Sequence, residues 1–183
     1  MFCLTDNPIS RYPKDRPLDE DLGRWAVVHV RSRQEQAFAH DLFDWNVPYY
    51  FPMVLTRTRR RDNGKVRKSL LPLFPGYVAI SMNQETKSRI YATNRIVSII
   101  PVADQRQFVD ELLQVQRAIN GNMKVALQPS FTAAQPVRIR SGPLAGLKGE
   151  VAQCGCKMIF VVWVHMFQRA VRVELDEADI EAL

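Results

Sequence analysis

A dense group of basic side chains between positions 57 and 68 offers the most evident chemistry in this sequence. Guanidinium and ammonium groups neutralise phosphates and release bound counterions, so such a group is typical of a surface that faces a polyanion. The alternative is an ordinary solvated hairpin, because exposed charges also prevent edge-to-edge pairing of strands. For any single arginine we favour the solvated role, and for the whole group we favour proximity to nucleic acid. The group consists of Arg57, Arg59, Arg60, Arg61, Lys65, Arg67 and Lys68.

The net charge of +6 is concentrated in the same part of the chain. Residues 24–70 carry ten basic and four acidic side chains, whereas residues 136–183 carry six of each. This asymmetry predicts a polyanion-facing surface in the N-terminal half and a different kind of partner for the C-terminal part.

Residue types that support catalysis or metal binding are present, but they form no known motif. His29, His40 and His165 lie on different predicted elements, and no Gly-rich phosphate-binding loop occurs. Cys154 and Cys156 are too closely spaced for an ordinary structural zinc pair. We therefore predict no catalytic residue, no metal site and no cofactor.

A stiff apolar segment follows the basic group directly. Pro72 and Pro75 fix the backbone and remove amide donors, and Gly76 permits a tight turn. The large side chains on this support form either a corner of the core or a rigid docking patch, and physical reasoning alone favours the core. They are Leu73, Phe74 and Tyr77.

Two segments of the sequence resemble one protein family. Residues 72–78, Pro-Leu-Phe-Pro-Gly-Tyr-Val, follow Arg24-Trp25-Ala26-Val27-Val28 and resemble the N-terminal domain of the NusG family of bacterial transcription elongation factors. Residues 137–151, with Gly142, Gly146 and Gly149, resemble the C-terminal KOW domain of that family. The two segments occur in the family's order, and the resemblance covers most of residues 24–183.

The expected fold is α+β, with an antiparallel sheet flanked by helices and then a small KOW-type β-barrel. Periodicity predicts these elements. Ser32 is expected to cap the first helix, with Glu35 completing a capping box. The expected strands cover residues 24–30, 53–61, 65–70, 77–82 and 97–101, and the expected helices run to about residue 46, from 84 to 91 and from 105 to 120.

Composition divides the chain into four parts. Residues 1–23 are charged, contain prolines and read as a flexible N-terminal extension. Residues 24–120 form the NusG-like domain, and residues 121–135 are polar and read as a linker. Residues 136–183 alternate short strands with turns, which predicts a barrel of about five strands.

The resemblance implies a partner for the apolar segment. In the NusG family an apolar surface of the N-terminal domain grips a coiled coil of the RNA polymerase β′ clamp. Carried over by position, this surface would comprise Phe74, Pro75 and Tyr77, with Leu73 and Tyr50 as neighbours. A role for Tyr77 in the core of its own domain remains an equal alternative.

The resemblance also implies contacts with DNA and with further proteins. Near the polymerase cleft, the basic residues would touch the non-template strand or the upstream duplex. The KOW barrel would recruit a small-subunit ribosomal protein or the Rho factor, and the glycines Gly142, Gly146 and Gly149 would form its turns. The basic residues assigned to DNA are Arg31, Arg33, Arg59, Arg60 and Lys65.

Other features of the sequence indicate the cellular compartment of the protein. No apolar run reaches the roughly 18 residues that span a bilayer. The three cysteines and the lack of a secretory signal favour a reducing compartment. We expect a cytoplasmic monomer that does not enter membranes.

These inferences predict a transcription elongation and antitermination factor that binds RNA polymerase, suppresses pausing and termination, and is not an enzyme. The charged extension, the compact basic hairpin and the Pro-Leu dipeptide before Phe74 favour an operon-specific, RfaH-like paralogue. The alternative is a KOW-containing RNA-binding or ribosome-associated protein.

Overall fold

The backbone follows the predicted alternation of strands and helices. The computed structural model describes residues 7–59, 66–121, 125–128, 135–141, 144–154, 157–167, 169–175 and 180–182. Two units can be separated, Met1–Ala103 and Asp104–Leu183, and each is described by itself. Within the described residues, no helix is both long enough and apolar enough to cross a membrane.

Unit 1 is built on a five-stranded antiparallel sheet with the order β1-β3-β6-β2-β7. The central strand β2 forms backbone hydrogen bonds with β6 along one edge and with β7 along the other. Its apolar side chains, including Val27 and Val28, are fully buried. The strands are β1 (Arg11–Tyr12), β2 (Arg24–Val30), β3 (Tyr49–Tyr50), β6 (Tyr77–Met82) and β7 (Ile96–Pro101).

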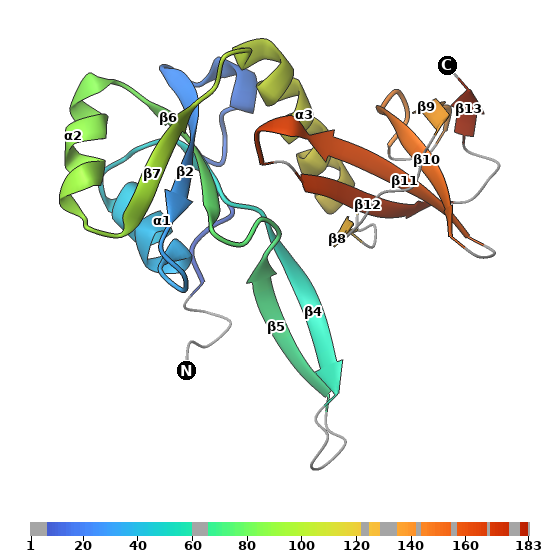
Figure 1. Cartoon of the computed structure of the whole chain (residues 1–183), viewed down its shortest axis with the longest axis horizontal. Coiled ribbons are helices and arrows are strands. Elements are labelled where there is room, and N and C mark those ends of the chain that lie inside the picture. Colours follow the sequence, from blue (N-terminus) through green and yellow to red (C-terminus); the bar gives the residue numbers. More distant parts are fainter. Residues whose placement is uncertain are drawn as a thin grey trace. The chain divides into compact units, whose positions relative to one another are not determined.

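Two helices cover one face of this sheet (Figure 1). Helix α1 (Glu35–Asp44) contributes Phe38 and Leu42 to the core, and α2 (Gln84–Ala92) contributes Ile90. These side chains are fully buried against alternate residues of the strands, including Val28 and Ile80. The amphipathic spacing of α1 therefore forms the core that the sequence predicts.

A separate two-stranded hairpin projects from the body of unit 1 (Figure 1). It consists of β4 (Met53–Arg59) and β5 (Val66–Pro72), which pair with each other along their whole described length. The predicted turn at residues 62–64 lies outside the described residues. The hairpin ends at Pro72, immediately before the apolar segment, so the basic group and the apolar corner are joined by a single strand.

The N-terminal segment differs from the predicted flexible extension. Residues 7–23 add the edge strand β1 to the sheet and form a 3-10 helix, η2 (Leu18–Glu20). Leu18 is fully buried, and Arg11 pairs with Asp21 at 2.5 Å although both side chains are almost completely shielded from solvent. One buried leucine and one buried ion pair thus order a segment whose average composition is that of a mobile tail. Residues 1–6 lie outside the described range.

Unit 2 combines helix α3 with a six-stranded antiparallel sheet of order β13-β9-β10-β11-β12-β8. Helix α3 (Gln105–Asn120) has the predicted bounds, and Asp104 caps it through its side chain. The strands are β8 (Val125–Gln128), β9 (Gln135–Ile139), β10 (Lys148–Cys154), β11 (Lys157–Val164), β12 (Arg169–Leu175) and β13 (Ile180–Ala182), with a 3-10 turn η3 (His165–Phe167) between β11 and β12.

Two features of this half bear on the sequence-based division at residues 120 and 135. Strand β8 lies within the predicted linker and pairs with β12. The contacts also group α3 with the barrel strands and not with unit 1. The predicted domain boundaries stay predictions. The predicted α+β class with a β-rich C-terminal part is confirmed.

Candidate functional site

Three hydrogen bonds connect the apolar corner between β5 and β6 to other segments of unit 1. The Leu73 amide donates to Pro52 O at 2.8 Å, and the Val30 amide donates to Gly76 O at 2.8 Å. The Gly76 amide donates to the Glu35 carboxylate at 3.0 Å. Gly76 has φ +84°, a conformation that only glycine adopts without strain. The corner is thus rigid, as its two prolines predict.

Most of the predicted docking side chains at this corner are not on the surface. Tyr50, Leu73 and Phe74 expose only 3%, 1% and 2% of their area. The expectation that they form an outward apolar patch is corrected by these values. Physical reasoning about the whole segment favours a buried corner, whereas the resemblance and the position of Phe74 between two prolines favour an exposed ring.

Pro75 and Tyr77 are the members of the predicted patch that reach solvent. Pro75 is exposed and Tyr77 is half-buried. The Tyr77 ring stacks on His29 of β2, with centroids 5.0 Å apart and planes inclined by 22°. Sequence reasoning treated His29 as an ordinary strand residue and missed this contact, because the pairing of β2 with β6 brings the two rings together.

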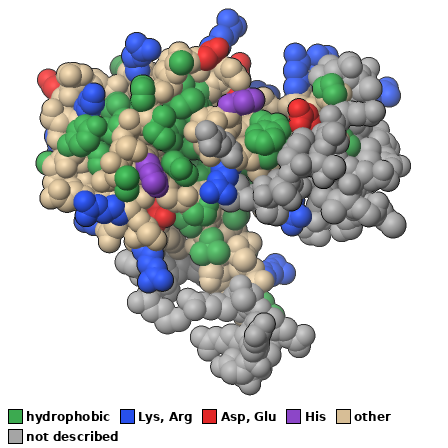
Figure 2. All heavy atoms as spheres, viewed as in Figure 1, with side chains coloured by type: hydrophobic (Ala, Val, Ile, Leu, Met, Phe, Trp, Pro, Cys, Tyr) green, Lys and Arg blue, Asp and Glu red, His purple; other side chains and the backbone are tan. Residues whose placement is uncertain are grey.

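The basic residues assigned to DNA occupy two places in unit 1. Arg31 and Arg33 are exposed in the connection from β2 to α1, where Arg33 has φ 65°. Arg59 ends strand β4. Arg60 and Lys65 lie outside the described residues. On the face drawn in Figure 2, lysine and arginine side chains surround a group of hydrophobic side chains over the body of unit 1.

The structure describes two of the three glycines that the resemblance assigns to turns of the KOW barrel. Gly149 lies in β10, where an added Cβ would come within 2.5 Å of Val161 O and 2.6 Å of the Phe160 ring. Gly146 has φ +86° and open space around it. Gly149 is therefore required by close packing and Gly146 by backbone conformation, whereas Gly142 lies outside the described residues.

Phe167, near the end of a barrel strand, is buried and packs edge-to-face against Phe108 of α3, with ring centroids 5.9 Å apart. Phe167 is therefore part of the core of unit 2. Met166 beside it is half-buried.

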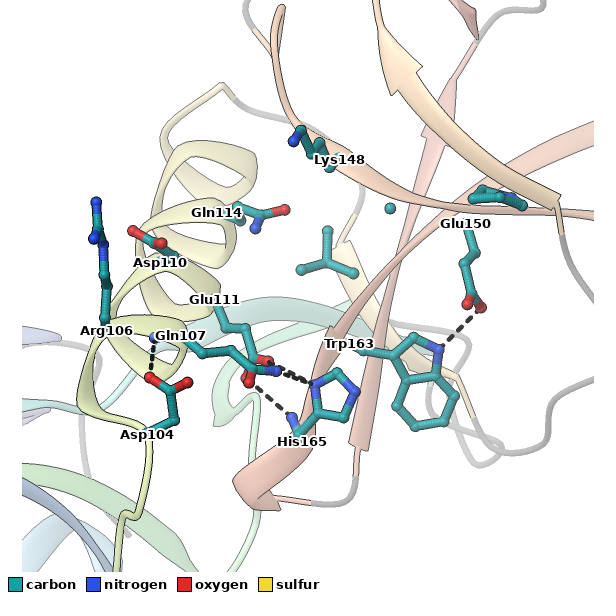
Figure 3. A pocket seen from close by; sticks show the side chains of 13 residues that line it. Asp104, Arg106, Gln107, Asp110, Glu111, Gln114, Lys148, Glu150, Trp163 and His165 are labelled. Atoms are coloured by element: carbon teal, nitrogen blue, oxygen red, sulfur yellow. Dashed lines mark hydrogen bonds and ion pairs between the residues drawn. The ribbon is translucent and has the colours of Figure 1, made fainter. Parts of the chain in front are cut away.

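A cavity of about 590 Å³ lies within unit 2 between α3 and strands β10 and β11 (Figure 3). Glu111 accepts hydrogen bonds from the His165 amide at 3.0 Å and from Gln107 Nε2 at 2.9 Å, and it pairs with His165 Nδ1 at 2.5 Å. Across the cavity, Trp163 Nε1 donates to Glu150 at 3.1 Å. These groups satisfy one another, so their evident role is to hold the helix and the strands together.

The described residues that line this cavity do not complete a nucleophilic triad. A histidine paired with a carboxylate resembles part of a nucleophilic triad, but the described lining residues include no serine, threonine or cysteine. No group of three potential metal ligands occurs in the part of the chain that the structure describes.

Comparison with known proteins identifies the family. Residues 23–119 match the family model of NusG, described as transcription termination factor NusG. The match extends through Ile119 in the last turn of α3.

Three relatives share the name transcription termination/antitermination protein NusG. The protein from Pseudomonas aeruginosa is 28% identical over 86% of this chain and 97% of its own length. The protein from Pasteurella multocida is 31% identical over 86% of this chain and 94% of its own length. The protein from Escherichia coli K12 is 28% identical over 86% of this chain and 95% of its own length. The chain belongs to the NusG family of non-enzymatic transcription factors.

Proposed function

We propose that this protein is a transcription termination/antitermination factor that binds RNA polymerase at the β′ clamp through the corner between β5 and β6. Membership of the NusG family carries the proposal. The corner adds a rigid support on which Pro75 and the half-buried Tyr77 present apolar surface. A preorganised surface loses little conformational entropy on docking, which favours affinity.

The buried neighbours have a supporting part in this proposal. Tyr50, Leu73 and Phe74 are buried, and a direct contact with the clamp would require their side chains to become exposed. We therefore assign the contact to Pro75 and Tyr77, and the positioning of both residues to the buried side chains.

DNA is the second partner in the proposal. Arg31, Arg33, Arg59, Arg60 and Lys65 would contact the non-template strand or the upstream duplex. The exposure of Arg31 and Arg33 and the charge of residues 24–70 support this assignment. Such contacts lose affinity steeply as salt increases.

The mechanism requires no covalent chemistry. A factor that bridges the clamp to nucleic acid at the cleft opposes clamp opening if its contacts are stronger in the closed state than in the open state. A closed clamp suppresses pausing and favours antitermination. We propose that the factor acts as a monomer in the cytoplasm. Binding of a ribosomal protein or of Rho by the barrel remains a prediction.

Transcription with purified polymerase tests the proposed activity. On a template with a defined pause site, added protein should shorten the pause, and a protein that binds the ribosome or RNA alone should leave the pause unchanged. Crosslinking across a genome then tests the operon-specific assignment. Signal at a few loci supports a specialised paralogue, and signal at every transcribed unit contradicts it.

A further inference from the structure

The cavity between α3 and strands β10 and β11 has the size of a small-molecule site. Its volume is about 590 Å³, within the usual range for pockets that hold ligands. The buried side chain of Val162 and the half-buried ring of Trp163 give it an apolar wall. Asp110 and Lys148 also line the cavity and are exposed, so a small molecule can enter it from solution.

One buried acceptor that faces this cavity has no donor. Gln114 Oε1 is shielded from solvent and receives no hydrogen bond from the part of the chain that the structure describes. Figure 3 shows the amide group of Gln114 pointing from α3 into the cavity. Most buried acceptors in proteins are satisfied, and an unsatisfied one lowers stability. A ligand that donates a hydrogen bond at this point would satisfy it.

The charges around the cavity favour a cationic donor. Four carboxylates and two permanent cations line it, which gives a formal charge of −2 while His165 is neutral. Glu111 is already bonded to His165 and Gln107. Asp110 forms no ion pair with any residue that the structure describes. The carboxylates belong to Asp104, Asp110, Glu111 and Glu150, and the cations are Arg106 and Lys148.

The available acceptors lie on two sides of the cavity. Gln114 and Asp110 belong to α3, whereas Glu150 belongs to β10, and Figure 3 shows Gln114 and Glu150 on opposite sides. One oxygen of Glu150 accepts the hydrogen bond from Trp163 Nε1, so its other oxygen can accept a second. Indole rings attract cations through their π face, and the apolar wall favours an organic cation over a hydrated metal ion.

We infer that this cavity binds an aliphatic polyamine. One ammonium group donates to Gln114 Oε1 and to the Asp110 carboxylate, and a second ammonium group donates to Glu150. The hydrocarbon chain between them packs against Val162 and Trp163. Hydrogen bonds from a charged donor to a carboxylate are about twice as strong as neutral ones. The inference concerns unit 2 alone and does not depend on the proposed contact with polymerase.

Isothermal titration calorimetry of the full chain with spermidine tests this inference. At constant ionic strength, spermidine should bind saturably, with one molecule per chain. 1-Aminobutane carries a single ammonium group and should bind at least about tenfold more weakly, the usual effect of one lost hydrogen bond to a charged group. Mg²⁺ at the same ionic strength measures attraction by charge alone and should bind more weakly than spermidine.

Substitutions in the cavity locate the bound molecule. Gln114→Leu and Asp110→Asn should each weaken spermidine binding by about fivefold or more, the effect of one lost hydrogen bond. Gln114→Glu keeps the length of the side chain, adds a negative charge and should strengthen binding. Lys148→Gln removes an opposing cation from the lining and should also strengthen binding.

Matched variants control these measurements. Gln116→Leu in α3 and Asp44→Asn at the end of α1 change residues that do not line the cavity, and they should leave the affinity unchanged. Spermidine should also change the tryptophan fluorescence. Trp163→Phe should abolish that change, whereas Trp45→Phe should retain it. Circular dichroism establishes that each variant is folded.

The absence of saturable spermidine binding would overturn the inference, as would equally strong binding of 1-aminobutane or Mg²⁺. Unchanged affinity for spermidine in the folded Gln114→Leu, Gln114→Glu and Asp110→Asn proteins would also overturn it, because the molecule would then bind elsewhere.

Discussion

The backbone amide of Gly76 donates a hydrogen bond to the carboxylate of Glu35, across 41 positions of sequence, at 3.0 Å. Glu35 is the first residue of α1, and Gly76 is the residue at which the apolar corner turns into β6. The helix and the corner are thus joined by a charged acceptor. Any displacement of α1 would move the surface formed by Pro75 and Tyr77.

Replacement of Glu35 tests this connection. Glu35→Ala removes the acceptor and should lower the free energy of unfolding by about 2 kcal/mol, the usual range for a hydrogen bond to a charged group. Glu35→Gln keeps an oxygen at the same position and should cost about half as much. Urea denaturation measures both values, and equal stability of the alanine variant and the unmodified protein would show that the bond contributes nothing.

The same residue shows what the sequence could predict and what it could not. The Ser-x-x-Glu pattern predicts a helix capped by Ser32, two residues before the observed cap position at Gln34. The helix is preceded by Gln34 without a side-chain cap, however, and Glu35 serves Gly76 instead of a capping box. A local pattern contains no information about a partner that only the folding of the sheet brings near.

Gly149 is the second position with a definite expected outcome. Gly149→Ala places a Cβ against the carbonyl of Val161, which belongs to the backbone and cannot rotate away. Overpacking of this kind typically costs about 1–3 kcal/mol. Gly146→Ala meets no atom within 4 Å, so it should lose only about 1 kcal/mol through its positive φ. Thermal denaturation followed by circular dichroism compares the two, and a greater loss in the Gly146 variant would contradict the packing explanation.

The buried Arg11–Asp21 pair should make the N-terminal segment sensitive to single substitutions. The side chain of Asp21 is fully shielded and that of Arg11 is 7% exposed. Asp21→Asn leaves a buried cation without its anion, which typically costs about 3–5 kcal/mol. Replacing both residues, as Arg11→Met/Asp21→Leu, should recover most of that loss. If the double variant is no more stable than Asp21→Asn in urea denaturation, the unpaired charge is not the cause.

The burial of two tyrosines predicts how the stability of the protein changes at alkaline pH. Burial raises the pKa of Tyr49 and of Tyr50 well above the ordinary value near 10, although Arg11 opposes the shift at Tyr50. Because the folded pKa is raised, the neutral phenols contribute their full stabilisation below pH 10 and lose it as the pH rises further.

Above pH 10.0, each buried phenol should therefore lower the free energy of unfolding by about 1.4 kcal/mol per pH unit. Tyr49→Phe/Tyr50→Phe should show a flatter profile of stability against alkaline pH. A profile as steep as that of the unmodified protein would mean that other groups cause the alkaline unfolding.

The apolar corner and the β4–β5 hairpin differ in how much of their structure could be predicted from the sequence. Pro72, Pro75 and Gly76 encode the rigidity of the corner locally, so that property could be read directly. The burial of Phe74 depends on residues distant in sequence, and the motif could not reveal it. For the hairpin, alternation predicted the strands, but only the register shows that Arg57 faces Lys68.

Binding of purified core RNA polymerase tests the central claim most directly. Tyr77→Ala removes the half-buried ring at the corner, and Tyr91→Ala removes a ring of the same kind that is 52% exposed on α2. Loss of a docked aromatic side chain typically costs about 2 kcal/mol or more, which corresponds to a weakening of at least about thirtyfold. We expect that loss for Tyr77→Ala and unchanged affinity for Tyr91→Ala. Unchanged affinity for a folded Tyr77→Ala protein would contradict docking at this corner.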